Sequence, residues 1–101
     1  MKITIKNKEF NSKKMTLSNY KKYTEVRDRI SEKDGYSYED LEDMIDVLVF
    51  TFDNQFTNDD IEEDLEVDEI IYNFLRLDIE IFEKLNKKID KTNKLFTKDK
   101  N

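Results

Sequence analysis

The chain has 101 residues and a formal net charge of −6, with 37% hydrophobic and 42% charged residues. It has neither Cys nor His, one Gly and no Pro. The absence of Cys and His excludes thiolate and imidazole chemistry, and a single Gly cannot build a phosphate-binding loop. We therefore expect one small domain that is not an enzyme and uses no cofactor.

Charge is strongly segregated along the chain. Residues 1–33 carry a net charge of +6, residues 34–83 a net charge of −17 and residues 84–101 a net charge of +5. Such blocks can pair within the fold, or copies of the chain can stack head to tail. The acidic middle block repels phosphate, so we do not expect nucleic acid as a partner. No apolar segment approaches the roughly 20 residues of a membrane span, which predicts a cytoplasmic protein without a membrane partner.

The first elements predicted are a β-hairpin and a helix. Residues 2–6 (KITIK) alternate apolar and polar side chains, which is the period of a strand. Asn7-Lys8 is the predicted turn, and residues 9–15 return as a second strand. Because an isolated hairpin is marginal in water, it must pack on helices. A helix then begins after an N-cap at Thr16 and ends near Glu32, before the only glycine.

A second helix begins after Ser37, which has an acid three residues on at Asp40. Its apolar residues recur at helical spacing, and it ends near Asp53-Asn54, because Asn and Asp compete with the helical backbone. Thr57 is the next predicted N-cap, for a short helix over residues 58–65.

The loop between these two helices carries three predicted structural residues, Phe52, Gln55 and Thr57. Phe52 and Phe56 hold the two helices together, Gln55 bridges backbone groups of the loop, and Thr57 starts the next helix. A calcium loop is the alternative for residues 53–64, but Gln55 stands at its third position and no glycine stands at its sixth. We therefore expect no metal at this loop.

The last predicted helix is long. It begins at Glu66 or Val67, ends near Thr92, and is apolar on more than one face, so one side must be covered by something outside its own core contacts. The candidate partner-contact residues are Phe56, Ile71, Leu75, Ile79 and Phe82, and the alternative for each of them is core packing.

The predicted fold is therefore mainly α with a small N-terminal β-hairpin and about four helices, the last one long. Residues 1–92 form a single helical domain, and residues 93–101 form a flexible, Lys-rich tail.

The order of these parts resembles the small tail assembly chaperones of long, non-contractile-tailed phages. The resemblance runs over about residues 1–90, through MKITIKNKEF, DLEDMIDVLVFTFDNQFTNDDIEEDL and VDEIIYNFLRLDIEIFEKLNKKI. Its most specific part is Phe52 to Thr57, followed by Asp60, Ile61 and Leu65. Similar proteins often have a Gly near position 64, where this chain has Asp64.

The resemblance implies a non-enzymatic protein of the host cytoplasm that is absent from the finished virion. Such proteins bind the tape measure protein and keep it soluble while the tail tube assembles around it. A frameshifted longer form is implied to recruit the tail tube protein, and self-association is implied as well. The alternative from a different class is an acidic regulatory or inhibitor protein that mimics nucleic acid.

Overall fold

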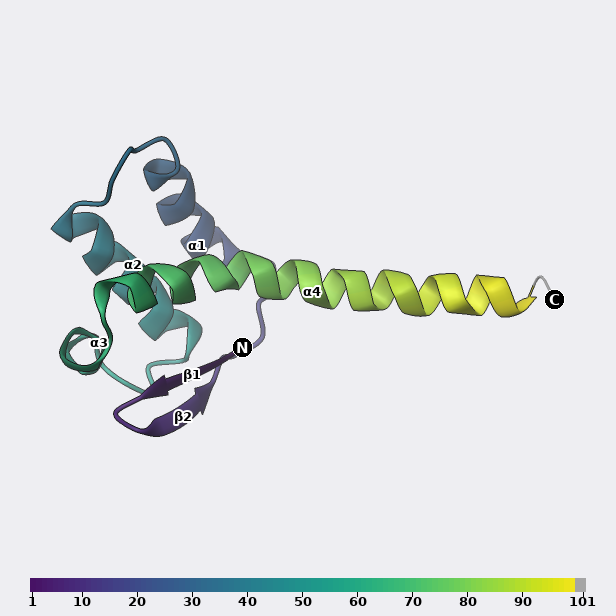
Figure 1. The fold of residues 1–101 in the computed structure, drawn as a ribbon, viewed down its shortest axis with the longest axis horizontal. Helices are drawn as coiled ribbons and strands as arrows, with labels where there is room; N and C mark the ends of the chain where they lie inside the picture. Colours follow the sequence, from purple (N-terminus) through teal and green to yellow (C-terminus); the bar gives the residue numbers. More distant parts are fainter. Residues whose placement is uncertain (100–101) are drawn as a thin grey trace.

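The computed structural model describes the backbone of residues 1–99 and the side chains of residues 1–94. A two-stranded antiparallel hairpin precedes four helices in this part of the chain (Figure 1). The fold class predicted from the sequence, mainly α with an N-terminal hairpin and a long last helix, is confirmed. The elements are β1 (Lys2–Ile5), β2 (Lys8–Asn11), α1 (Leu17–Ile30), α2 (Tyr38–Thr51), α3 (Asn58–Asp64) and α4 (Val67–Asp99).

The hairpin turns one residue earlier than predicted. Lys6 and Asn7 both have positive φ, 52° and 64°, and Ile5 pairs with Lys8 across the two-residue loop. A turn with two positive φ angles matches the right-handed twist of its strands, and Asn tolerates this conformation well. The second strand ends at Asn11 rather than at residue 15, because the chain must leave the hairpin to begin α1.

Side-chain caps set the start of the first two helices, as predicted. The hydroxyl of Thr16 accepts a hydrogen bond from the backbone N–H of Asn19. Ser37 and Asp40 form a reciprocal capping box at the start of α2. Each cap satisfies backbone N–H groups that have no partner inside the helix.

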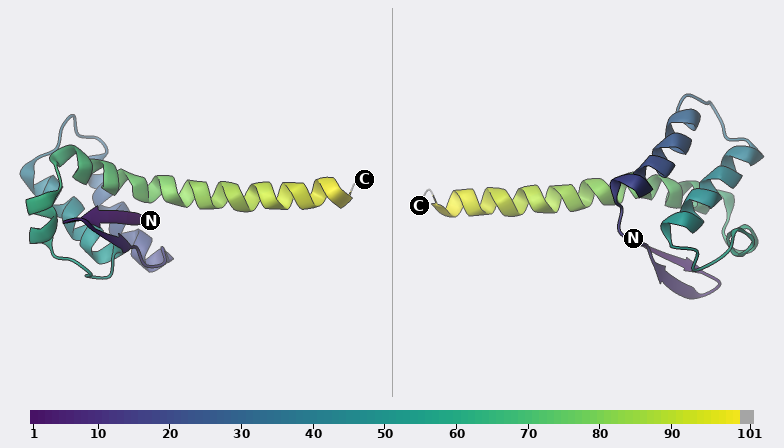
Figure 2. Two further views of the ribbon diagram at one scale, coloured as in Figure 1. Left: turned by 60° about the horizontal axis from the view of Figure 1, so that its bottom comes forward. Right: turned by 180° about the vertical axis from the view of Figure 1, so that it is seen from behind.

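Helix α2 is the centre of the core and contacts α1, α3 and α4. The strand β1 supplies Ile3 and Ile5, which lie on the buried side of the hairpin. Seen from behind, the hairpin and α1 lie at opposite edges of the body, with α2 between them (Figure 2, right). The buried apolar side chains are Ile3, Ile5, Tyr23, Ile30, Met44, Ile45, Val47, Leu48, Val49, Phe52, Phe56, Ile61, Ile70, Phe74 and Leu77.

Helix α4 leaves this body and projects from it (Figures 1 and 2). Its first turns pack on the core through Ile70, Phe74 and Leu77, but every side chain from Phe82 to Lys94 is exposed. The radius of gyration is 16.5 Å, against about 13 Å for a compact chain of this length. Among the described residues, the projecting half of the helix is therefore largely without tertiary support.

Helix α4 also continues past its predicted end near Thr92, to Asp99. The division into a domain of residues 1–92 and a flexible tail of residues 93–101 stays a prediction, and residues 100 and 101 lie outside the described part of the chain.

Candidate partner-binding surface on the last helix

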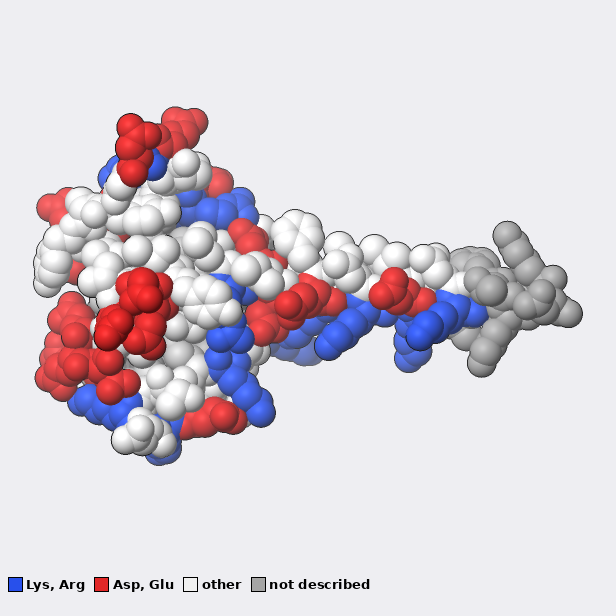
Figure 3. All heavy atoms as spheres, in the orientation of Figure 1, with Lys and Arg blue, Asp and Glu red and all other residues white. Residues whose placement is uncertain are grey.

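The candidate functional surface is a line of apolar side chains on α4, which we call the exposed apolar row. It consists of Leu75, Ile79, Phe82, Leu85 and Ile89, which are 43%, 48%, 60%, 47% and 46% exposed. Their spacing of four, three, three and four residues places them on one face over about 21 Å of helix. Figure 3 shows uncharged atoms along one side of the projecting helix and charged side chains along the other. An apolar face of this length in contact with water is a candidate binding surface.

Three of the predicted partner-contact residues lie in this row, namely Leu75, Ile79 and Phe82. Ile71 lies one turn before Leu75. Its side chain is half-buried because it packs against the core, so Ile71 is not part of the exposed row. Leu85 and Ile89 were missing from the predicted contact set, although their helical spacing continues the same face beyond Phe82. Sequence periodicity alone could have extended the row to them.

Phe56 does not belong to this surface. Its side chain is 5% exposed, and its ring lies 5.1 Å from that of Phe10 and 5.4 Å from that of Phe52, measured between centroids. The tight α2–α3 joint carries the ring between the hairpin and α2. Core packing, the alternative stated from the sequence, therefore accounts for Phe56, and it is inaccessible to a partner.

The α2–α3 joint is held by the three residues predicted to shape it. Phe52 is fully buried at the end of α2, and the side-chain amide of Gln55 donates to the carbonyls of Phe52 (2.8 Å) and Asn11 (2.7 Å). Thr57 and Asp60 form a capping box at the start of α3. Asp53 and Asn54 both have φ of 57°, which ends α2. Gln55 therefore ties the joint to the hairpin as well as closing it.

The tip of the hairpin is attached to α3 by Lys6. Its backbone N–H donates to Asp64 (2.8 Å), and its ammonium group contacts Asp60 (3.0 Å) and Glu63 (2.8 Å). These hydrogen bonds, first with Glu63 and then with Asp60, raise the pKa of Lys6. Because Lys6 is largely exposed, solvent screens this cluster, and its effect is to orient the hairpin rather than to add much stability.

A polar cluster fixes α1 to α4 just before α4 leaves the body. The carboxylate of Asp78 accepts hydrogen bonds from the hydroxyls of Tyr23 (2.8 Å) and Tyr20 (3.1 Å), and from the Arg27 guanidinium (3.0 Å). Burial, followed by the bond to Asp78, raises the pKa of Tyr23. The partners of Asp78 are more than 50 residues away in the chain, so no local sequence pattern predicts this cluster. The cluster sets the position from which the exposed apolar row extends.

Other ion pairs also join the basic first block to the acidic middle block. Arg29 pairs with Asp43, and Lys33 pairs with Asp40 at 2.8 Å. The Asp40 side chain is 1% exposed. The hydrogen bond from Lys33, followed by the backbone N–H of Ser37, lowers the pKa of Asp40 to about 2. Together with the pairs of Lys6 and Arg27, these two ion pairs neutralise part of the segregated charge within the fold.

The described residues include one group of carboxylates close enough to share a metal ion: Glu66, Asp68 and Glu69, whose oxygens lie within 4.8 Å of one another. All three are exposed at the start of α4, where the helix dipole favours negative charge without any ion. They do not define a metal site. Within residues 1–99, no helix has the length and apolar character needed to cross a bilayer.

The fold and the exposed apolar row define a small helical binding protein: a compact body from which one amphipathic helix projects. The model of a family described as "Phage tail chaperone protein" matches residues 1–94. The chain therefore belongs to the phage tail chaperone family. No curated protein and no solved structure matches it. Family membership supports a tail assembly role and a tail protein as partner, and it suggests a non-enzymatic function.

Proposed function

We propose that this chain binds the tape measure protein, keeps it soluble, and helps the tail tube to assemble around it. The observation that carries the proposal is the exposed apolar row of α4. Five large apolar side chains are left in water there, each about half exposed. Covering such surface is favourable by about 25 cal/mol per Å². A long helical client with its own apolar face is the partner that a straight helical row fits.

The geometry favours a side-by-side contact between two helices. The side chains from Phe82 to Lys94 are all exposed, so a client helix can approach along this part of the row without displacing any core residue. Helices packed in this way have their axes about 8–10 Å apart. The charged side chains on the opposite face keep the complex in solution.

The other parts of the proposal follow from the resemblance to chaperones of long-tailed phages. A longer, frameshifted form recruits the tail tube protein, several copies coat one client, and the protein works in the host cytoplasm without entering the virion. The exposed row supports coating, because each copy covers only about 21 Å of a much longer client.

The acidic nucleic-acid mimic is less well supported. A mimic needs free carboxylates at regular spacing on one rigid face. Here Asp40, Asp43, Asp60, Glu63 and Asp78 are engaged with cations of the same chain. These five carboxylates therefore hold the fold rather than contribute to a free acidic face.

Co-expression with the tape measure protein of the same phage tests the proposal. We expect soluble client that co-purifies with this chain. The double variant Phe82→Gln/Ile89→Gln removes two exposed row residues and should leave the client insoluble. The matched control, Lys87→Gln/Lys91→Gln, makes two changes of the same kind at exposed positions elsewhere on α4 and should retain solubilisation. A client that stays insoluble with the unmodified chain, or equal behaviour of the two variants, would contradict this function.

A further inference from the structure

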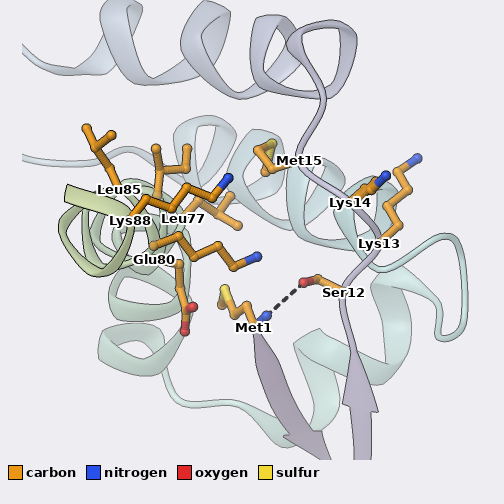
Figure 4. Close-up of a pocket in the computed structure, with 11 residues that line it drawn as sticks. Met1, Ser12, Lys13, Lys14, Met15, Leu77, Glu80, Leu85 and Lys88 are labelled. Carbon is orange, nitrogen blue, oxygen red and sulfur yellow. Dashed lines mark hydrogen bonds between the residues drawn. The ribbon is translucent and has the colours of Figure 1, made fainter. Parts of the chain in front are cut away.

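A concave surface lies where α4 leaves the body, between α4 and the segment that joins β2 to α1 (Figure 4). Its volume is about 410 Å³. Met15, Leu77 and Leu85 are among the apolar side chains that line it, and lysines line it from both sides. We call it the lysine groove. Leu85 also belongs to the exposed apolar row, so the two surfaces are continuous.

The positive charge of the lysine groove is unmatched. Lys84 and Lys88 reach it from α4, and Lys14 from the joining segment. None of these three lysines has a carboxylate within ion-pair distance in the described part of the chain. The single acid of the lining, Glu80, is paired with Arg76 at 3.3 Å. Figure 4 shows the Lys88 side chain extending from α4 toward Met15.

Four cations elsewhere in the body differ from these lysines. Lys6, Arg27, Arg29 and Lys33 each have a carboxylate partner in the same chain. Unpaired ammonium groups gathered around an apolar floor are complementary to a ligand that has both apolar side chains and carboxylates.

We propose that the lysine groove selects the client: it binds a helical segment whose apolar face covers the row and whose flank carries carboxylates over the lysines. This inference rests on the proposed function and adds the chemistry of the segment recognised. Because Leu85 belongs to both the exposed apolar row and the lysine groove, one amphipathic helix can cover the row and reach Lys84 and Lys88 together.

Two synthetic helical peptides of about three heptads test the inference. They have the same leucine face, and one carries Glu and the other Lys on both flanks. We expect the acidic peptide to bind about tenfold more tightly at low salt, a ratio that corresponds to 1.4 kcal/mol. The preference should shrink as ionic strength rises, because screening weakens exposed charge pairs. Fluorescence anisotropy of labelled peptides gives both dissociation constants.

Charge reversal in the groove provides the specific test. Lys84→Glu/Lys88→Glu should abolish the preference for the acidic peptide. Lys87→Glu/Lys91→Glu is the matched control: it has the same spacing, the same helix and the same change in net charge, but these lysines do not line the groove. This control should keep most of the preference. Circular dichroism melts of both variants check that the body remains folded.

The outcomes separate the two proposals. If neither peptide binds, the proposed function and this inference both fail. If both peptides bind equally, or if the two double variants lose the preference equally, only the groove inference is overturned. It is also overturned if Lys84→Glu/Lys88→Glu disperses a homo-oligomer, seen by analytical ultracentrifugation, while the acidic peptide does not compete for that surface.

Discussion

Two phenylalanine substitutions distinguish a side chain of the core from a side chain of the exposed apolar row. Phe56→Ala removes a ring that is 5% exposed and packed between two other rings, whereas Phe82→Ala removes a ring that is 60% exposed. The chemical change is identical in the two variants. Only the surroundings differ, so the pair isolates the effect of burial.

The expected cost of Phe56→Ala is about 3–5 kcal/mol, the range for removing a buried aromatic ring and leaving a cavity. A domain of this size has a total stability of only about 5–15 kcal/mol. The variant should therefore unfold at least about 12 °C below the unmodified chain. Phe82→Ala should change the free energy of unfolding by less than about 0.5 kcal/mol, because the ring is mostly in water and Ala favours helix.

Urea titration followed by circular dichroism measures both values. We expect the midpoint of Phe56→Ala to fall by more than about 1 M. In the co-expression assay the order should reverse, so that Phe82→Ala weakens client solubilisation although its stability is unchanged. A loss of less than about 1 kcal/mol for Phe56→Ala would refute the assignment of this ring to the core.

Three further substitutions test the polar contacts. Asp78→Asn should lower the free energy of unfolding by about 2 kcal/mol, because the charge-assisted hydrogen bonds to Tyr23 and Arg27 are lost. Urea titration measures this loss, and a value below about 0.5 kcal/mol would contradict the expectation. Thr57→Ala should cost about 1 kcal/mol in the same assay through loss of the N-cap, and no change would mean that the cap is dispensable. The pKa of Asp40 is lowered to about 2 in the folded chain, against about 3.9 in the unfolded chain. The pairing of Asp40 with Lys33 therefore stabilises the fold fully above the unfolded pKa, and this stabilisation is lost as the pH falls through about 2. The melting temperatures of the unmodified chain and Asp40→Asn should therefore converge from about pH 4 to pH 2, and a constant difference would refute it.

Local chemistry explains why so much of the fold was predictable. The N-caps at Thr16, Ser37 and Thr57 act within three residues, so a short window of sequence contains both partners of each hydrogen bond. The turn at Lys6-Asn7 was placed one residue late, because its position depends on strand register, which is set by packing of the hairpin.

The candidate surface was predicted in part. Helical spacing identified Leu75, Ile79 and Phe82 as one apolar set, but periodicity cannot distinguish a face that packs on the core from a face left in water. The same limit explains Phe56, an aromatic residue in an acidic loop that proved to be buried.

The amino-acid sequence alone was sufficient to predict the helices and strands, their caps and the charge blocks, because these depend on neighbours within a few positions. Tertiary structure was needed to show that α4 is exposed on all its side chains from Phe82 to Lys94, that Asp78 joins it to α1, and that unpaired lysines line the groove. Each of these features depends on groups far apart in the chain. Whether a side chain is core, ion pair or binding surface is therefore settled by what folding brings next to it.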